Sequence, residues 1–234
     1  MRGERRIKNL HKNIIKAGLT VILLGTGPFL ATPAFAGKHK TPTSNGSNTS
    51  NQSSRTLAAW NEAYERWAFG ELAITIDSNG NAIADNQVVL IPVPDASGDG
   101  TPGHLDVTLN AGEAFVLPLW VLLGADHTDA TPPTALEPLS VFQALNLTFQ
   151  IDGVTVVNQA NALKFYSVFS FKPPIQVNNS PPINSIIWFQ GISIVHAPLP
   201  VGTHTFQLDA VNTQPALGGF FEYHDTWTVT VRPK

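Results

Sequence analysis

Four consecutive residues, Asp126-His127-Thr128-Asp129, place three side chains that can bind a metal ion in one short segment. The segment lies in residues 124–138, a Thr- and Pro-rich stretch that is typical of a loop. Carboxylate oxygens and imidazole nitrogens are ligands for zinc or calcium. Asp126, His127 and Asp129 are therefore candidate metal ligands, but closed zinc sites show sharper paired spacings, and a solvated loop explains the same composition.

Two other pairs of residues could complete such a site. His104 and Asp106, like Glu222 and His224, lie two positions apart in segments that we expect to be strands. Alternate residues of a strand share one face, so each pair would point the same way. Whether either pair approaches Asp126 depends on the fold.

A second candidate metal site is the turn-like segment that begins at Asp95. Counted from Asp95 as position one of a calcium loop, Ser97 and Asp99 take positions three and five, and Gly100 takes position six. Position twelve is Asp106, a shorter acid than the usual Glu. An ordinary turn composition also accounts for this segment.

Other polar residues lie where catalysis would need them or where they serve only structure. Asp225 falls in the apolar row of the last expected strand, where burial would raise its pKa, although an acceptor near the strand entry has the same pattern. His196 and His204 flank the turn at 198–202 and could simply cap it. The sequence contains no Gly-x-Ser-x-Gly, no His-Glu-x-x-His and no phosphate-binding glycine loop, which favours a non-enzymatic role.

The elements that must position these residues read mainly as strands. Apolar and polar residues alternate at 145–151, and Asp152-Gly153 then predicts a tight turn into the strand 154–157. The other expected strands share this period or are short apolar runs, and they span 72–76, 86–93, 104–110, 114–123, 165–171, 186–196, 203–211 and 221–231. No helix separates them, so the pattern predicts an all-β fold, an antiparallel β-sandwich of jelly-roll or immunoglobulin-like type.

One helix is expected before the strands, at residues 56–69, with Thr56 as its cap and Gly70 at its end. Its aromatic residues Trp60, Tyr64 and Trp67 fall on one face, which is typical of a helix docked on a core. The chain has five tryptophans, and flat rings exposed on a sandwich would suggest carbohydrate binding. Most of them lie in apolar surroundings, and finding all five buried would remove the main support for that idea.

The N-terminal region predicts export. A basic stretch precedes an apolar run of about 15 residues that ends at Ala34-Phe35-Ala36, the pattern of a cleaved signal peptide covering residues 1–36 and too short for a membrane helix. An uncleaved anchor is the alternative. Residues 37–55 read as a disordered Ser/Asn-rich linker, and residues 56–234 as a single domain.

Cleavage would make the protein acidic. It takes the 14 basic and 17 acidic residues to 8 and 16, and the formal net charge to −8. Such a charge disfavours nucleic acid as a partner, because phosphate binding relies on clustered Lys and Arg. The chain has no cysteine, so no disulfide can stabilise it outside the cell, and no later segment is long enough to span a membrane.

The last 150 or so residues resemble a group of uncharacterised secreted bacterial proteins. The motifs that carry the resemblance occur in the same order along this chain, at 109–118, 151–156, 165–171, 197–205 and 223–229. The resemblance implies an exported β-sandwich with no assigned activity, and it implies no catalytic or binding residue. This chain departs from the pattern because its N-terminal half lacks cysteines.

The sequence thus predicts a secreted or periplasmic β-sandwich that acts as a non-enzymatic binding or envelope-associated module, with carbohydrate as a possible partner class. The alternative is a metal-assisted hydrolase built on the 124–138 loop. No cofactor is predicted beyond calcium or zinc at the candidate sites.

Overall fold

A computed structural model describes residues 55–84, 88–94, 98–177, 182–212 and 221–234. The predicted signal peptide and all but the last residue of the predicted linker lie outside these ranges. So does the start of the calcium-like segment, at residues 95–97. No described helix is long and apolar enough to cross a membrane.

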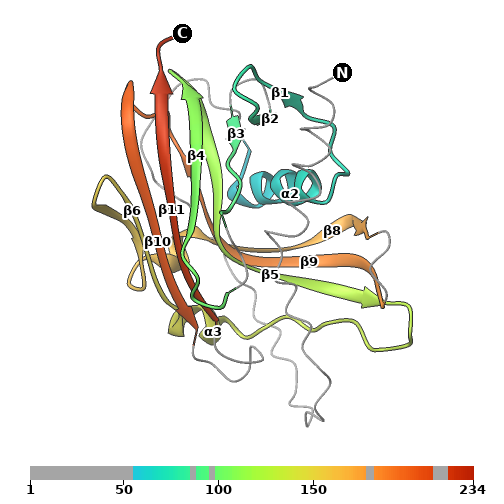
Figure 1. Cartoon of the computed structure of the whole chain (residues 1–234). Helices are drawn as coiled ribbons and strands as arrows, with labels where there is room; N and C mark the ends of the chain where they lie inside the picture. The colour runs from blue at the N-terminus through green and yellow to red at the C-terminus, as the bar shows by residue number, and fades with distance from the viewer. Residues whose placement is uncertain (1–54, 85–87, 95–97, 178–181, 213–220) are drawn as a thin grey trace.

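The protein is an all-β sandwich of two packed sheets, as the alternating pattern predicts (Figure 1). The six-stranded sheet has the order β1-β2-β3-β5-β9-β8, and the five-stranded sheet has the order β4-β11-β10-β6-β7. Strands of the first sheet are β1 (Thr75–Ile76), β2 (Ala82–Ala84), β3 (Val88–Leu90), β5 (Ala114–His127), β8 (Tyr166–Gln176) and β9 (Ile183–His196). Strands of the second are β4 (Gly103–Asn110), β6 (Asn146–Ile151), β7 (Val154–Asn158), β10 (Gly202–Asn212) and β11 (Phe221–Arg232).

Most neighbouring strands are antiparallel, but two pairs are parallel, which the prediction of antiparallel pairing missed. Strand β3 runs parallel to β5, and β4 runs parallel to β11. Strand β4 comes between β3 and β5 in the chain and lies in the other sheet. Because the chain reverses direction before β4 and again after it, β5 runs in the same direction as β3. Local periodicity reports strands, not which distant strand each one joins.

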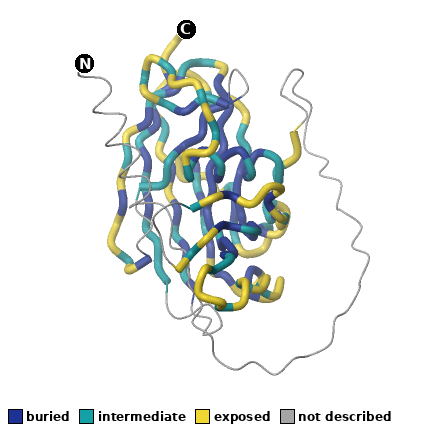
Figure 2. Tube along the Cα trace, turned by 90° about the vertical axis from the view of Figure 1, so that its right-hand side faces the viewer, coloured by how far each residue is buried: buried dark blue, intermediate teal, exposed yellow. Residues whose placement is uncertain are grey.

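The central core lies between the sheets and contains residues of both layers. Figure 2 marks the buried positions along the strands in dark blue. In β11 the residues at odd positions point inward, and Trp227 and Val229 are fully buried. Phe206 of β10 lies against Phe115 of the opposite sheet, with ring centroids 5.1 Å apart. The even-numbered residues of β11 therefore point outward, as the period of two requires.

Helix α2 (Leu57–Ala68) covers the outer side of the six-stranded sheet and matches the predicted helix. The Thr56 hydroxyl accepts a hydrogen bond from the Ala59 amide at 3.2 Å, which confirms the cap. The helix contacts β5, β8 and β9, and its aromatic face is buried in a second apolar cluster. The prediction of a docked aromatic face is therefore confirmed.

Two features of the layers were not predicted. A short helix, α3 (Leu139–Ala144), and a 3-10 turn, η1 (Ala162–Phe165), pack on each other near one end of the sandwich. Strands β5 and β9 are each 14 residues long, and register shifts interrupt their pairing near Pro118, Gly124 and Asp126. Such irregularities bend strands, and the far ends of β5, β8 and β9 curve away from the five-stranded sheet (Figure 1).

Candidate binding surface

The residues of the predicted metal loop lie at the end of β5 and just after it. The carboxylate of Asp126 accepts a hydrogen bond from the Asn184 side-chain amide at 3.2 Å. Asp129 accepts the backbone amide of Thr131 at 3.1 Å, and hydrogen bonding to Thr131 lowers the pKa of Asp129. His127 Nδ1 is buried and has no hydrogen-bond partner among the described residues.

These residues do not assemble with the other candidate ligands. His104 and Asp106 are on β4, and Glu222 and His224 are on β11, in the sheet opposite to the β5 strand that carries Asp126. Within the described ranges no three or more His, Asp or Glu side chains are grouped so that they could hold a metal ion. The predicted metal loop therefore gains no support from the geometry.

The five tryptophans are all buried, with exposed fractions between 0% and 7%. Trp188 and Trp227 also use their indole N–H groups internally, as donors to the carbonyl oxygens of Thr134 and Pro92. Carbohydrate stacking on exposed tryptophan, which the sequence left open, is therefore wrong for this fold. The rings fill the cores because each one lies on an inward or helix-covered face.

The other singled-out residues have structural surroundings. Asp225 points inward and is 1% exposed. His196 stacks on Phe115, and its Nδ1 lies 2.7 Å from the Ala197 carbonyl oxygen. His204 joins two loops, because its Nδ1 lies 2.6 Å from Asp152 Oδ2 and its Nε2 lies 2.9 Å from the Pro200 carbonyl oxygen.

The pKa values of Asp152 and His204 are shifted in opposite directions, and both shifts favour the charged forms of the pair. Burial lowers the pKa of His204, but its contacts with Asp152 and Pro200 outweigh burial, so its pKa is raised. The hydrogen bond with His204 lowers the pKa of Asp152. A raised His pKa stabilises the fold below the unfolded value of about 6.5, and a lowered Asp pKa stabilises it above about 3.9.

We predict that the stabilisation from this pair is greatest between those two values. It is lost as the pH rises through the folded pKa of His204 or falls through that of Asp152. Half of the Asp152 side chain is exposed, so the contribution is no more than about 1 kcal/mol. Replacement Asp152→Asn should lower the pKa of His204, measured by NMR titration, and should leave that of His224 in the separate cluster on β11 raised. A His204 pKa that does not change on replacement of Asp152 would contradict the conclusion that Asp152 raises it.

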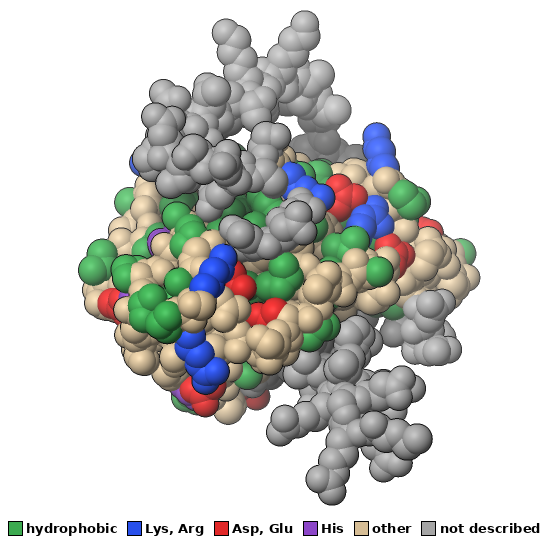
Figure 3. Space-filling model, turned by 90° about the horizontal axis from the view of Figure 1, so that it is seen from above, with side chains coloured by type: hydrophobic (Ala, Val, Ile, Leu, Met, Phe, Trp, Pro, Cys, Tyr) green, Lys and Arg blue, Asp and Glu red, His purple; other side chains and the backbone are tan. Residues whose placement is uncertain are grey.

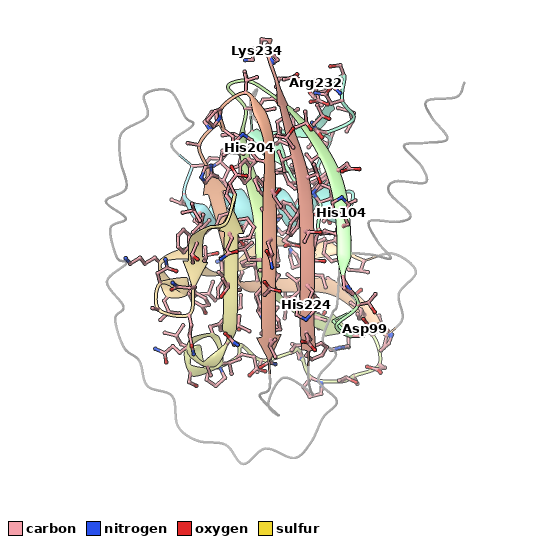
Figure 4. All side chains as sticks on the ribbon, turned by 60° about the vertical axis from the view of Figure 1, so that its left-hand side comes forward. Asp99, His104, His204, His224, Arg232 and Lys234 are labelled. Atoms are coloured by element: carbon pink, nitrogen blue, oxygen red, sulfur yellow. The ribbon has the colours of Figure 1, made fainter. Side chains whose placement is uncertain are left out.

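The outer surface of the five-stranded sheet is the remaining candidate for function. We call it the polar face, and it consists of the outward side chains of β4, β6, β10 and β11. No described helix covers it, whereas α2 covers the other sheet (Figures 1 and 4). Its centre is formed by Thr205, Gln207, Asp209, His224, Thr226 and Thr228.

Hydroxyl groups form rows across the polar face. Thr205 pairs with Thr228, and Thr203 pairs with Thr230, whose other neighbour is Thr108 of β4. Neighbouring strands lie about 4.8 Å apart, and same-face residues of one strand lie about 7 Å apart. The face therefore presents donors and acceptors on a regular flat grid.

His224 bridges two carboxylates on this face. Its Nδ1 lies 2.8 Å from Asp209 Oδ1, and its Nε2 lies 2.8 Å from Glu222 Oε1. The hydrogen bond with Asp209, and then that with Glu222, raises the pKa of His224. Gln207 donates to the other oxygen of Asp209 at 2.9 Å, which holds the cluster in place.

His104 occupies the neighbouring strand, and Figure 4 shows it above His224 on the same face. The Thr226 hydroxyl donates a hydrogen bond to the Gly103 carbonyl oxygen at 3.1 Å. Its oxygen therefore acts as the acceptor toward Nδ1–H of His104, which lies 2.9 Å away. The Nε2 atom of His104 lies 3.3 Å from Asp106. Arg232, the last residue of β11, and Lys234 just beyond it lie at the opposite end of this sheet from His224 (Figure 4).

Figure 3 shows the molecule from above, looking along the edges of the sheets. There, hydrophobic, acidic and basic side chains are interspersed among residues of other types.

The sequence analysis did not identify the polar face. The signal that could have found it is the run of threonines at every second position, Thr226, Thr228 and Thr230, facing Thr203 and Thr205. Period two places each run on one face, but only the pairing of β10 with β11 sets the two runs side by side.

Comparisons with known proteins give little similarity. No protein-family model matches the chain, and no curated protein matches it. Among solved structures, the cysteine protease inhibitor EhICP2 from Entamoeba histolytica matches with 12% identity and a TM-score of 0.22, over 62% of this chain and 94% of the inhibitor. PbICP-C, solved in complex with falcipain-2, matches with 10% identity and a TM-score of 0.25, over 62% of this chain and 99% of that protein. Likeness this low carries no inference about function.

Proposed function

We propose that the protein is a non-enzymatic, exported binding module whose polar face binds a hydroxyl-rich polymer of the carbohydrate class. The observation that carries the proposal is the grid of hydrogen-bonding side chains on the five-stranded sheet, which no described helix covers. Export and an envelope-associated location rest on the predicted leader and remain part of the proposal.

The chemistry of the face suits sugar hydroxyls. Threonine hydroxyls both donate and accept, Gln207 donates and accepts through its amide, and Asp106 accepts through its carboxylate. Hydrogen bonds to charged acceptors are stronger than those between neutral groups. Because the tryptophans are buried, binding would depend on hydrogen bonds and not on ring stacking. We therefore expect modest affinity for each sugar unit of the polymer.

The metal-assisted hydrolase remains an alternative proposal. A hydrolase needs a placed metal or a nucleophile with a base. The described residues supply no metal cluster, so no observation favours this alternative.

Co-sedimentation with insoluble cellulose, chitin and peptidoglycan, followed by a glycan array, tests the binding proposal. The double replacement Thr205→Lys and Thr228→Lys places two long side chains at the centre of the polar face, where the two threonines pair. We expect it to weaken binding at least tenfold. The matched control is Ser170→Lys, an exposed position on β8 of the other sheet, which should bind as the unmodified protein does.

Two results would refute the proposal. One is the absence of binding to every polysaccharide by the unmodified protein. The other is equal binding by the double variant and by the Ser170→Lys control, which would place the contact elsewhere.

A further inference from the structure

Four polar residues are buried together beneath helix α2, between two apolar clusters. Asn61 and Glu65 of the helix are 1% and 2% exposed. Ser167 of β8 and Ser193 of β9 are 9% and 0% exposed. Buried polar groups are costly unless each has a hydrogen-bond partner, so this cluster needs an explanation.

The fold brings the four together in a simple way. Asn61 and Glu65 are one helical turn apart and share the face that docks on the sheet. Ser167 pairs with Gly191, and Ser193 follows two residues later, so strand alternation points both serines at the helix. Helix α2 contacts both of these strands.

The hydrogen bonds within the cluster leave two buried oxygen atoms without a partner among the described residues. The Asn61 side-chain amide donates to Ser167 Oγ at 2.7 Å. Asn61 Oδ1 and Ser193 Oγ are buried and have no partner among the described residues. An amide oxygen can only accept, so Asn61 needs a donor from a nearby group.

Among the described residues, no charged group of the surrounding elements faces Glu65. The sheet surface on both sides of the helix is apolar, including Val116, Leu123, Phe169, Phe171, Phe189 and Val195. The Tyr64 hydroxyl donates to the Ile91 carbonyl oxygen at 2.9 Å.

The nearest cation of the helix is committed elsewhere. Arg66 binds Glu62 and Glu71 at 3.0 and 2.7 Å, and it also donates to the Pro173 carbonyl oxygen. No described cation therefore compensates an ionised Glu65.

We propose that Glu65 holds helix α2 on the sheet as a neutral carboxylic acid that donates a hydrogen bond to Asn61 Oδ1. Long helical side chains lean toward the preceding turn, which directs the Glu65 carboxyl over Asn61. The series of hydrogen bonds Glu65–Asn61–Ser167 then links the helix to β8, and of the two forms of Glu65 only the protonated acid can donate the first of them.

The electrostatics agree with this geometry. Burial raises the pKa of Glu65 to about 8. A folded pKa above the unfolded value means that the folded state binds the proton more tightly, so stability decreases as the pH rises from about 4.5 to about 8 and is level above that. Docking of α2 is thus coupled to protonation of Glu65, and raising the pH from about 4.5 to about 8 weakens it.

The test compares Glu65→Gln with the unmodified full chain. Gln is neutral at every pH, and its amide can still donate to Asn61 Oδ1. We expect the folding equilibrium constant of the variant, relative to the unmodified protein, to increase about tenfold per pH unit from pH 5 to pH 8. Glu62→Gln on the same helix, whose side chain is 38% exposed, should show no such trend. A ratio that does not change with pH would overturn the proposal.

A second measurement does not depend on that variant folding. The pKa of Glu65, read from its carboxyl carbon by NMR, should lie well above 4.5, and Asn61→Ala should weaken its proton affinity about tenfold. Hydrogen exchange of α2 amides, corrected for intrinsic rates, should accelerate relative to β11 amides as the pH rises from about 5 to about 8, and should change little above that. An ordinary Glu65 pKa, or one that Asn61→Ala leaves unchanged, would refute the hydrogen bond.

Discussion

Replacement of Trp227 by alanine is expected to lower the free energy of unfolding by about 3–5 kcal/mol, the usual cost of removing a large buried aromatic side chain. Trp227 is fully buried at the centre of the sandwich, with its ring near Phe149 and Phe206 at centroid distances of 6.4 and 6.5 Å. Its indole N–H donates to the Pro92 carbonyl oxygen at 2.9 Å, which ties β11 to the segment after β3. Urea denaturation followed by circular dichroism measures the change.

The variant Trp227→Phe separates the two contributions of this residue. Phenylalanine keeps most of the ring but leaves the Pro92 carbonyl oxygen without its donor, which costs about 1–3 kcal/mol. The loss should therefore be clearly smaller than for alanine. Equal losses in both variants would show that the hydrogen bond, and not the ring volume, dominates.

Replacement of Gly124 by alanine should destabilise the fold by about 3 kcal/mol, the upper end of the usual range for overpacking a core. Gly124 pairs with Trp188 across β5 and β9, and a Cβ at position 124 would lie 1.9 Å from the indole atom Cε2. The indole has little freedom to move, because Trp188 is 7% exposed and donates to the Thr134 carbonyl oxygen at 2.7 Å. The same denaturation experiment measures the loss.

A double-mutant cycle identifies the cause. Leucine at position 188 removes the ring that the new methyl group would meet, so Gly124→Ala should cost much less in a Trp188→Leu background than alone. If the two losses simply add, the clash with Trp188 is not the reason for the glycine.

Much of the secondary structure follows from local pattern. The alternation at 145–151 predicts β6, and the Asp152-Gly153 turn into β7 is present, with Asp152 at φ 52° and Gly153 at φ 75°. The helix and its Thr56 cap are also as predicted. These features depend on residues close together in the chain, which is why sequence alone reveals them.

The structure does not support the predictions about functional sites. Asp126, His127 and Asp129 have the right chemistry for a metal, yet the described residues do not group them with other ligands. Exposed tryptophans were considered as sugar platforms, and all five are buried. A residue type reports what a side chain can do, whereas its neighbours from other strands decide what it does.

By itself, the sequence determined the alternation of strands such as β6, the position of helix α2 and the absence of disulfides, and it predicts a leader. Only the tertiary structure decided which sheet surface lies under α2 and which stays open, because that choice depends on contacts between segments far apart in the chain. It placed the threonines of β10 and β11 side by side on an open face, and it placed Glu65 beneath a helix with an unfilled acceptor one turn away. Period two tells which side chains share a face, but it does not tell whether that face meets water or protein.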